Sequence, residues 1–116
     1  AAKEVYPNGN VYCASKHAVD ALSKSMRIDL AGHNIRVSAI HPGAVETEFS
    51  EVRFKGDKKL ASEVYQGFDA LQAKDIAEII EFVTSRPSHV NIEDLVVYPT
   101  AQANTTTGQY CAVTSN

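Results

Sequence analysis

The sequence predicts a doubly wound α/β fold with a parallel sheet, of which it supplies only the C-terminal half. Two short segments rich in β-branched residues, 35–40 and 95–98, are typical of strands, and a longer amphipathic segment typical of a helix precedes each of them. Helices that alternate with strands indicate a parallel sheet, which is stable only when it is wide and covered on both faces. Because two strands are too few for such a sheet, we expect the other strands to lie outside residues 1–116.

The first helix is expected over about residues 12–31. Pro7, Asn8 and Gly9 give the segment before it turn chemistry. Apolar residues then recur at helical spacing, at Ala14, Ala18, Leu22, Met26 and Leu30. Gly32 follows the last of these residues, and we expect it to cap the C-terminus of the helix.

The remaining elements continue the same alternation. A strand is expected over 35–40, and a short helix over 57–65. A second amphipathic helix has its apolar face marked by Ile76, Ile79, Ile80 and Val83. Asp75 is placed to start this helix, and Pro87 requires it to end earlier, because proline clashes with a helix interior. The last strand is expected over 95–98.

Composition and charge narrow the class of protein. The content of 44% hydrophobic and 22% charged residues is ordinary for a globular domain, so we expect one unit over 1–100, followed by a polar C-terminal tail over 101–116. A net charge of -3 with scattered Lys and Arg offers no basic surface for nucleic acid. No apolar run approaches the roughly 18 residues of a membrane span. The N-terminal residues also lack a signal-peptide pattern, so we expect a cytoplasmic protein without a membrane partner.

The cysteines and histidines do not indicate a metal site. The two cysteines, Cys13 and Cys111, lie far apart, and neither belongs to a Cys-x-x-Cys pair. The four histidines show no spacing that suits a zinc ligand set. We therefore assign no metal to this chain.

Tyr12 and Lys16 are the first candidates for catalysis. Their four-residue spacing at the start of a helix places both side chains on one face, with β-carbons about 5 to 6 Å apart. An ammonium group so close favours transfer of the phenolic proton, which makes the tyrosine a usable general acid or base for a hydroxyl that becomes a carbonyl. The spacing alone also fits a half-buried tyrosine beside a solvated lysine, so the surrounding motifs have to decide.

Residues 42–47 are the second candidate region. They follow the C-terminal end of an expected parallel strand, where open α/β sheets bind their ligands. Pro42 keeps the residue before it extended, Gly43 lets the backbone approach a flat ring closely, and Thr47 can bond a carboxamide. Pro-Gly is also a common turn, so this region by itself allows a purely structural interpretation.

Together these motifs resemble the short-chain dehydrogenase/reductase family. Tyr-x-Ala-Ser-Lys, at 12–16, opens a long helix, and the next strand ends in Pro-Gly-x-Val-x-Thr, at 42–47. The resemblance implies a Rossmann-like fold, an NAD(P)-dependent oxidoreductase and a homotetramer or dimer. It also implies that Tyr12 is the catalytic acid/base and contacts the cofactor, and that Lys16 supports catalysis and binds the nicotinamide ribose. The residues implied to line the nicotinamide are Pro42, Gly43, Val45 and Thr47.

A narrower likeness concerns the NADP-dependent 3-hydroxy acid dehydrogenases, which oxidise serine, allo-threonine and related hydroxy acids. It depends on residues 47–57, 88–92 and 99–102. It implies NADP as cofactor, with NAD as the alternative, and a small hydroxy acid or related alcohol or carbonyl as substrate. Arg53 is the candidate to bind the substrate carboxylate through two parallel hydrogen bonds. An arginine there also fits a surface ion pair or a subunit contact.

Some motifs of the family do not occur between residues 1 and 116. No glycine-rich turn that would hold a pyrophosphate is present, and the resemblance places the catalytic serine just before Ala1. We therefore expect the chain to be inactive alone and to act as part of a longer enzyme. Two alternatives remain open, a 3-oxoacyl thioester reductase and a non-catalytic module that keeps the fold.

Overall fold

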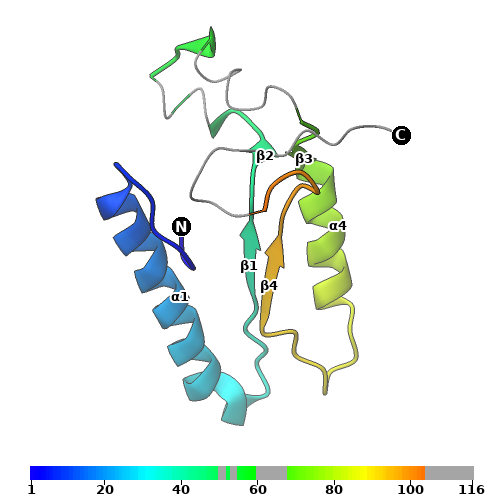
Figure 1. Cartoon of the computed structure of the whole chain (residues 1–116). Coiled ribbons are helices and arrows are strands. Elements are labelled where there is room, and N and C mark those ends of the chain that lie inside the picture. Colours follow the sequence, from blue (N-terminus) through cyan, green and yellow to red (C-terminus); the bar gives the residue numbers. More distant parts are fainter. Residues whose placement is uncertain (50–51, 53–54, 60–67, 104–116) are drawn as a thin grey trace.

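The computed structural model describes residues 1–49, 52, 55–59 and 68–103. Two parallel strands, β1 (Ala39–Pro42) and β4 (Asp94–Val97), form the centre of this part of the chain. Figure 1 shows α1 (Asn10–Leu30) on one side of the strands and α4 (Ala73–Thr84) on the other. The arrangement of helix, parallel strands and helix confirms the predicted α/β class.

Strand β1 differs from its predicted bounds, because it begins at Ala39 and continues through Pro42. The backbone N–H groups of Ala39 and Gly43 donate to Glu93 and Val97 at 3.0 and 2.7 Å, on the β4 side. Alternate residues of a strand direct their N–H groups to opposite sides. Residue 42 would therefore direct its N–H away from β4, so proline at this position removes no bond from the β1–β4 pair.

Helix α1 begins two residues earlier than predicted and ends differently. Gly32 does not cap it; this glycine lies inside a 3₁₀ turn, Ala31–His33, and Asn34 adopts the left-handed conformation with φ 57°. The Asn34 N–H donates to the Ala31 carbonyl at 3.2 Å. Asparagine is one of the few residues other than glycine that tolerate this conformation, so the predicted Gly32 cap is wrong by two residues.

Helix α4 begins and ends where the sequence predicts. Gln72 and Asp75 form a reciprocal capping box, in which the Gln72 N–H donates to the Asp75 carboxylate at 2.7 Å. The helix ends at Thr84, before Pro87. At this end the Arg36 guanidinium donates to carbonyls of the last turn and of the following loop, including Thr84 at 3.1 Å. These bonds satisfy acceptors that a helix terminus leaves without partners.

Two further short strands pair in parallel as a separate sheet, beyond the C-terminal ends of the main pair (Figure 1). These are β2 (Val45–Glu46) and β3 (Leu71–Gln72), which leads directly into α4. Neither was predicted, because two residues are too few to show a strand period. Of the short helix expected over 57–65, Lys58 and Lys59 are helical and Asp57 is not, and residues 60–65 lie outside the described residues.

The described part of the chain buries little apolar surface. Its buried apolar residues are Cys13, Val83 and Ala101, and of these only Cys13 is fully buried. Large apolar side chains on α1 remain exposed, including Val19, Leu22 and Ile28. Apolar surface of this extent normally packs against something else.

Within the same residues, no helix combines the length and the apolar character needed to cross a bilayer.

Candidate functional site

Tyr12 and Lys16 lie together on the first turns of α1, as their spacing predicts. The Lys16 Nζ lies 5.6 Å from the centroid of the Tyr12 ring. Tyr12 is 39% exposed, so its phenol can be reached from outside the described part of the chain. A cation over an aromatic ring is attracted to it, which keeps the ammonium near the phenol.

A cavity of about 400 Å³ lies between α1 and β1. Its wall includes Tyr12 and Lys16 from the helix, and His41 and Pro42 from the end of the strand. The structure therefore brings the catalytic candidates together with the first residue of the predicted cofactor loop. Among the described residues that form the wall, the other members of that loop, Gly43, Val45 and Thr47, are not included.

The loop after Pro42 is held by the C-terminal part of the chain. Gly43 N–H donates to the Val97 carbonyl at 2.7 Å, and Ala44 N–H donates to the Gln102 side chain at 2.8 Å. Val45 then enters β2. Exposed Thr47 accepts a bond from the Phe49 N–H at 3.3 Å, and a hydroxyl that accepts one bond keeps its proton for another partner.

Gly43 has a packing role that the sequence did not indicate. A β-carbon at this position would overlap the Gln102 Oε1 and would lie 2.7 Å from the Tyr98 ring. The neighbouring side chains therefore occupy the space where any other residue would place its side chain. Glycine is required here by the chain's own packing, in addition to the close ligand approach predicted from the sequence.

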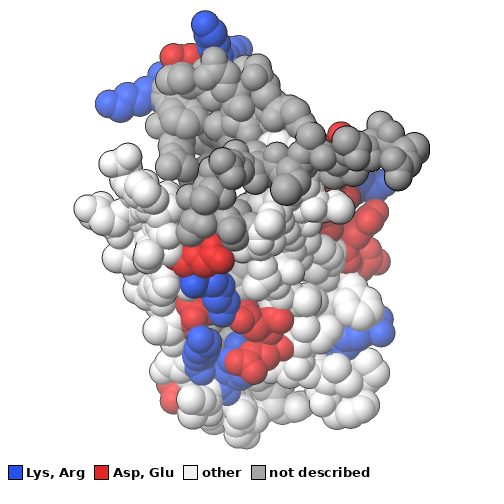
Figure 2. Space-filling view, in the orientation of Figure 1, with Lys and Arg blue, Asp and Glu red and all other residues white. Residues whose placement is uncertain are grey.

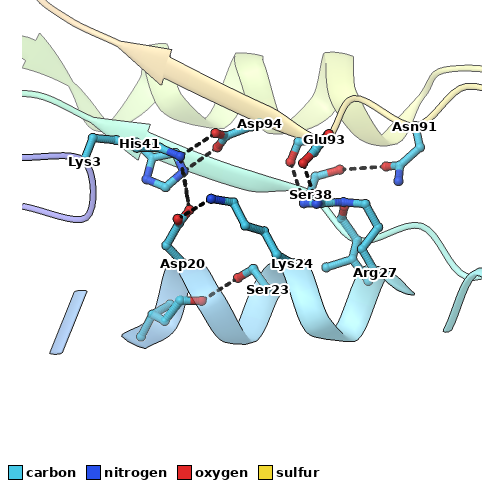
Figure 3. Close-up of polar contacts among 12 residues, drawn as sticks. Lys3, Asp20, Ser23, Lys24, Arg27, Ser38, His41, Asn91, Glu93 and Asp94 are labelled. Carbon is cyan, nitrogen blue, oxygen red and sulfur yellow. Dashed lines mark hydrogen bonds and ion pairs between the residues drawn. The ribbon is translucent and has the colours of Figure 1, made fainter. Parts of the chain in front are cut away.

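A cluster of charged side chains links α1 to the two strands (Figure 3). Asp20 on α1 accepts from Lys24 at 2.8 Å and from Lys3 at 3.2 Å. Lys3 also donates to Asp94, at the start of β4, at 2.7 Å. The His41 imidazole contacts Asp94, and its Nε2 lies 3.8 Å from Asp20. Figure 2 shows acidic and basic side chains adjoining in a band over this side of the molecule.

The ion pairs of this cluster shift the ionisation of its members. Hydrogen bonds from Lys24 and then Lys3 lower the pKa of Asp20 to about 2. The Lys3 ammonium likewise lowers the pKa of Asp94, and its bond to Asp94 raises the pKa of Lys3 itself. Both carboxylates are therefore ionised at neutral pH, and each has a lysine beside it.

Asp20, His41 and Asp94 also bring three potential metal-ligating atoms within 4.8 Å of one another. The sequence analysis assigned no metal to these residues. Two ammonium groups, from Lys3 and Lys24, already bond to the carboxylates. This arrangement favours an ion-pair network that joins the helix to the strands, since the negative charges that would attract a cation are already balanced.

The ion pairs of Asp20 predict an acid-dependent loss of stability. The folded-state pKa of about 2 is depressed from the ordinary value of 3.8. Such a carboxylate stabilises the fold fully above its ordinary pKa, and the stabilisation is lost as the pH falls towards the folded value. In the full-length protein, Asp20→Asn should lower the melting temperature by a few degrees at pH 6, and the difference should shrink progressively below pH 3.8.

Thermal unfolding of both proteins across a pH series measures this effect. Asp29→Asn is the control, because Asp29 is an exposed carboxylate on the same helix. An Asp20→Asn difference that stayed constant down to pH about 2, or a control with the same profile, would contradict the assignment.

Three functional candidates need separate mention. Arg53, predicted to bind a substrate carboxylate, lies outside the described residues. Asp20, which lies on the cavity wall, was missed, and so was Gln102, which contacts the 42–47 segment from outside the cavity. Asp20 follows Lys16 by one helical turn, so a search along that helix face would have found it. The Gln102 contact joins residues 58 positions apart, and no sequence period predicts it.

Comparison with known proteins gives consistent matches. A family model described as short chain dehydrogenase matches residues 1–58. An uncharacterised oxidoreductase of Mycobacterium tuberculosis is 52% identical over 104 residues, which cover 90% of this chain and 41% of the relative. The NADP-dependent 3-hydroxy acid dehydrogenase of Schizosaccharomyces pombe is 42% identical over 102 residues, which cover 88% of this chain and 39% of the relative.

A solved structure agrees with these sequence matches. The closed form of serine dehydrogenase complexed with NADP⁺ superposes with a TM-score of 0.85 and 44% identity, covering 88% of this chain and 42% of that protein. The chain thus spans about two-fifths of the length of the proteins that it matches.

Proposed function

Because the chain belongs to the short-chain dehydrogenase family, we propose that it is the C-terminal catalytic part of a longer oxidoreductase that transfers hydride between NADP(H) and a small hydroxy acid. One observation carries the proposal. The Tyr12 phenol and the Lys16 ammonium lie side by side on the wall of a cavity that also reaches Pro42. These groups sit together at the end of a parallel strand, where α/β folds place their ligands.

The cavity residues fit a nicotinamide nucleoside. Lys16 offers an ammonium that donates to ribose hydroxyls, and Pro42 begins the segment that would lie along the ring, with Gly43, Val45 and Thr47 after it. When bound, the nicotinamide supplies or accepts the hydride. As the phenolate, Tyr12 would take the proton from the substrate hydroxyl during oxidation, and as the phenol it would return this proton during reduction. Lys16 keeps positive charge beside the phenol while this proton moves.

The choice of NADP and of a hydroxy acid has support from two relatives. The Schizosaccharomyces pombe protein is named for NADP and 3-hydroxy acids, and the matching solved structure is a serine dehydrogenase with NADP⁺. A carboxylate-bearing substrate needs a cationic partner, and Arg53 remains our candidate for it.

The exposed apolar face of α1 supports association with other subunits. Val11, Leu22 and Met26 are exposed on one face of this helix, and apolar residues of this kind are buried in stable oligomers. We propose a homotetramer or a dimer. We also propose that residues 1–100 form the catalytic part, and the burial of Ala101 and Gln102 extends the packed region two residues further.

Steady-state assays of the full-length protein test the proposed reaction. L-serine, L-allo-threonine and 3-hydroxybutyrate are oxidised with NADP⁺ or NAD⁺ in parallel, and reduction of a 3-oxoacyl thioester is measured beside them. We expect turnover of at least one hydroxy acid, with kcat/KM at least about 10-fold higher for NADP⁺ than for NAD⁺.

The other outcomes distinguish the alternatives. Turnover of the thioester alone would favour the 3-oxoacyl reductase. Absence of turnover with every pair would favour the non-catalytic module. A preference for NAD⁺ would overturn the cofactor assignment and leave the reaction class intact.

A further inference from the structure

Gln102 is a buried polar side chain outside the catalytic cavity. It is 8% exposed, although glutamine is usually found at the surface. A turn positions it, since the Gln102 N–H donates to the Pro99 carbonyl at 2.9 Å. A buried amide is costly unless it is hydrogen-bonded. The burial of this side chain therefore indicates that its hydrogen bonds stabilise one conformation of the backbone around it.

One partner of the Gln102 side chain is the main chain of the predicted cofactor loop. Ala44 N–H donates to the Gln102 Oε1 at 2.8 Å. Because an N–H requires an acceptor, the side-chain oxygen and not the amide nitrogen must face Ala44. On the residue before it, the Gly43 N–H donates to the Val97 carbonyl. Two successive backbone donors of the loop are thus held by the segment that contains β4 and the turn after it.

Side-chain packing reinforces these bonds. Gln102 Cδ lies 3.1 Å and Tyr98 Cδ1 lies 2.7 Å from the place where a β-carbon on Gly43 would be. Ala101, next to Gln102, is also buried. The loop and the C-terminal turn are therefore in close contact, and neither can shift far without displacing the other.

We infer that Gln102 is a positioning residue, whose side-chain carbonyl fixes the backbone at Gly43 and Ala44 in the form that receives the nicotinamide. The inference extends the proposed function and rests on it for the identity of the ligand. Gln102 acts through the loop and touches no reacting atom. Its loss should loosen the loop before the cofactor binds, so that cofactor affinity falls more than the rate of the chemical step.

Hydrogen–deuterium exchange of the full-length protein without cofactor tests directly whether Gln102 holds the backbone at Gly43 and Ala44. Gln102→Met keeps the size of the side chain and removes the acceptor, whereas Gln102→Glu retains an acceptor oxygen. We expect peptides covering residues 41–48 to exchange about 3- to 10-fold faster in Gln102→Met. Gln102→Glu should restore most of the protection. Unchanged exchange in Gln102→Met would overturn the inference.

Cofactor titration tests the functional consequence. The Kd for NADPH, from its fluorescence, should rise about 3- to 10-fold in Gln102→Met and return towards the wild-type value in Gln102→Glu. The kcat at saturating cofactor should stay within about twofold. Faster exchange with an unchanged Kd would show that the contact is only structural, and it would overturn the positioning role.

A second variant changes the loop side of the same contact. Gly43→Ala should displace Gln102 and raise the Kd for NADPH. The double variant with Gln102→Met should raise this Kd little further, because both changes break the same contact. Gly32→Ala is the matched control, since a β-carbon at Gly32 meets nothing within 4 Å among the described residues. Fully additive effects would contradict a shared role.

Wild-type protein that bound neither NADPH nor NADH would refute the proposed function alone, because the exchange comparison requires no cofactor.

Discussion

Replacement of Tyr12 by Phe in the full-length enzyme is expected to lower kcat by about 10²- to 10⁴-fold, the usual contribution of a positioned general acid or base. Phenylalanine keeps the ring beside Lys16 and removes only the hydroxyl that we propose moves the proton. The Kd for NADPH should change by less than about threefold, since the cation and the ring remain in place. A loss confined to kcat distinguishes a chemical role from a binding role.

Steady-state kinetics with the best hydroxy acid, together with NADPH titration, measure this effect. Tyr6→Phe is the control, because it removes a hydroxyl from a nearby tyrosine whose ring packs against Gly9. The control should keep kcat within about twofold. Retention of most of the activity by Tyr12→Phe would remove this residue from the mechanism.

Replacement of Lys16 by Met should have the second largest effect, a fall of about 10²- to 10³-fold in kcat/KM. The ammonium lies 5.6 Å from the Tyr12 ring centroid, so its loss removes the positive charge beside the phenol. The same change removes the donor proposed for the ribose hydroxyls. In contrast to Tyr12→Phe, this variant should therefore weaken NADPH binding as well as lower kcat.

Lys74→Met provides the comparison for this variant. The Lys74 side chain is 84% exposed and makes a long ion pair with Glu78 on α4, so its removal should leave both constants unchanged. If Lys16→Met bound NADPH as tightly as the wild type, Lys16 would have no role in holding the cofactor.

The sequence predicts the elements of the fold where a long period or a proline marks them. Helix α4 shows this most clearly, because Asp75 starts it and Pro87 limits it, and both expectations are confirmed. The strand through Pro42 was placed too early, since proline normally ends a strand and only the pairing direction shows that no bond is lost. The left-handed cap expected at Gly32 is found at Asn34, because a 3₁₀ turn, Ala31–His33, continues the chain beyond α1.

The candidate site likewise contains residues that local spacing predicts and residues that only the folded structure brings together. The helical spacing of Tyr12 and Lys16 is a local property, so their shared face follows from the sequence alone. Gln102 and Asp94 lie outside the cavity and contact the strand and loop beside it through strand pairing and turns, which depend on the register between distant segments. Such register is set by the packed fold, and no pattern within either segment specifies it. Residues that act through long-range contacts were therefore found only in the structure.

A crystal structure of the full-length protein with NADP⁺ tests the central claim most directly, namely that Tyr12 and Lys16 form one site facing the nicotinamide. The account predicts that the Lys16 Nζ donates to the nicotinamide ribose, with the Tyr12 hydroxyl next to the reacting end of the ring and the 42–47 segment along its edge. Cofactor bound elsewhere, or a Tyr12 hydroxyl buried against protein and out of reach of the ring, would contradict it.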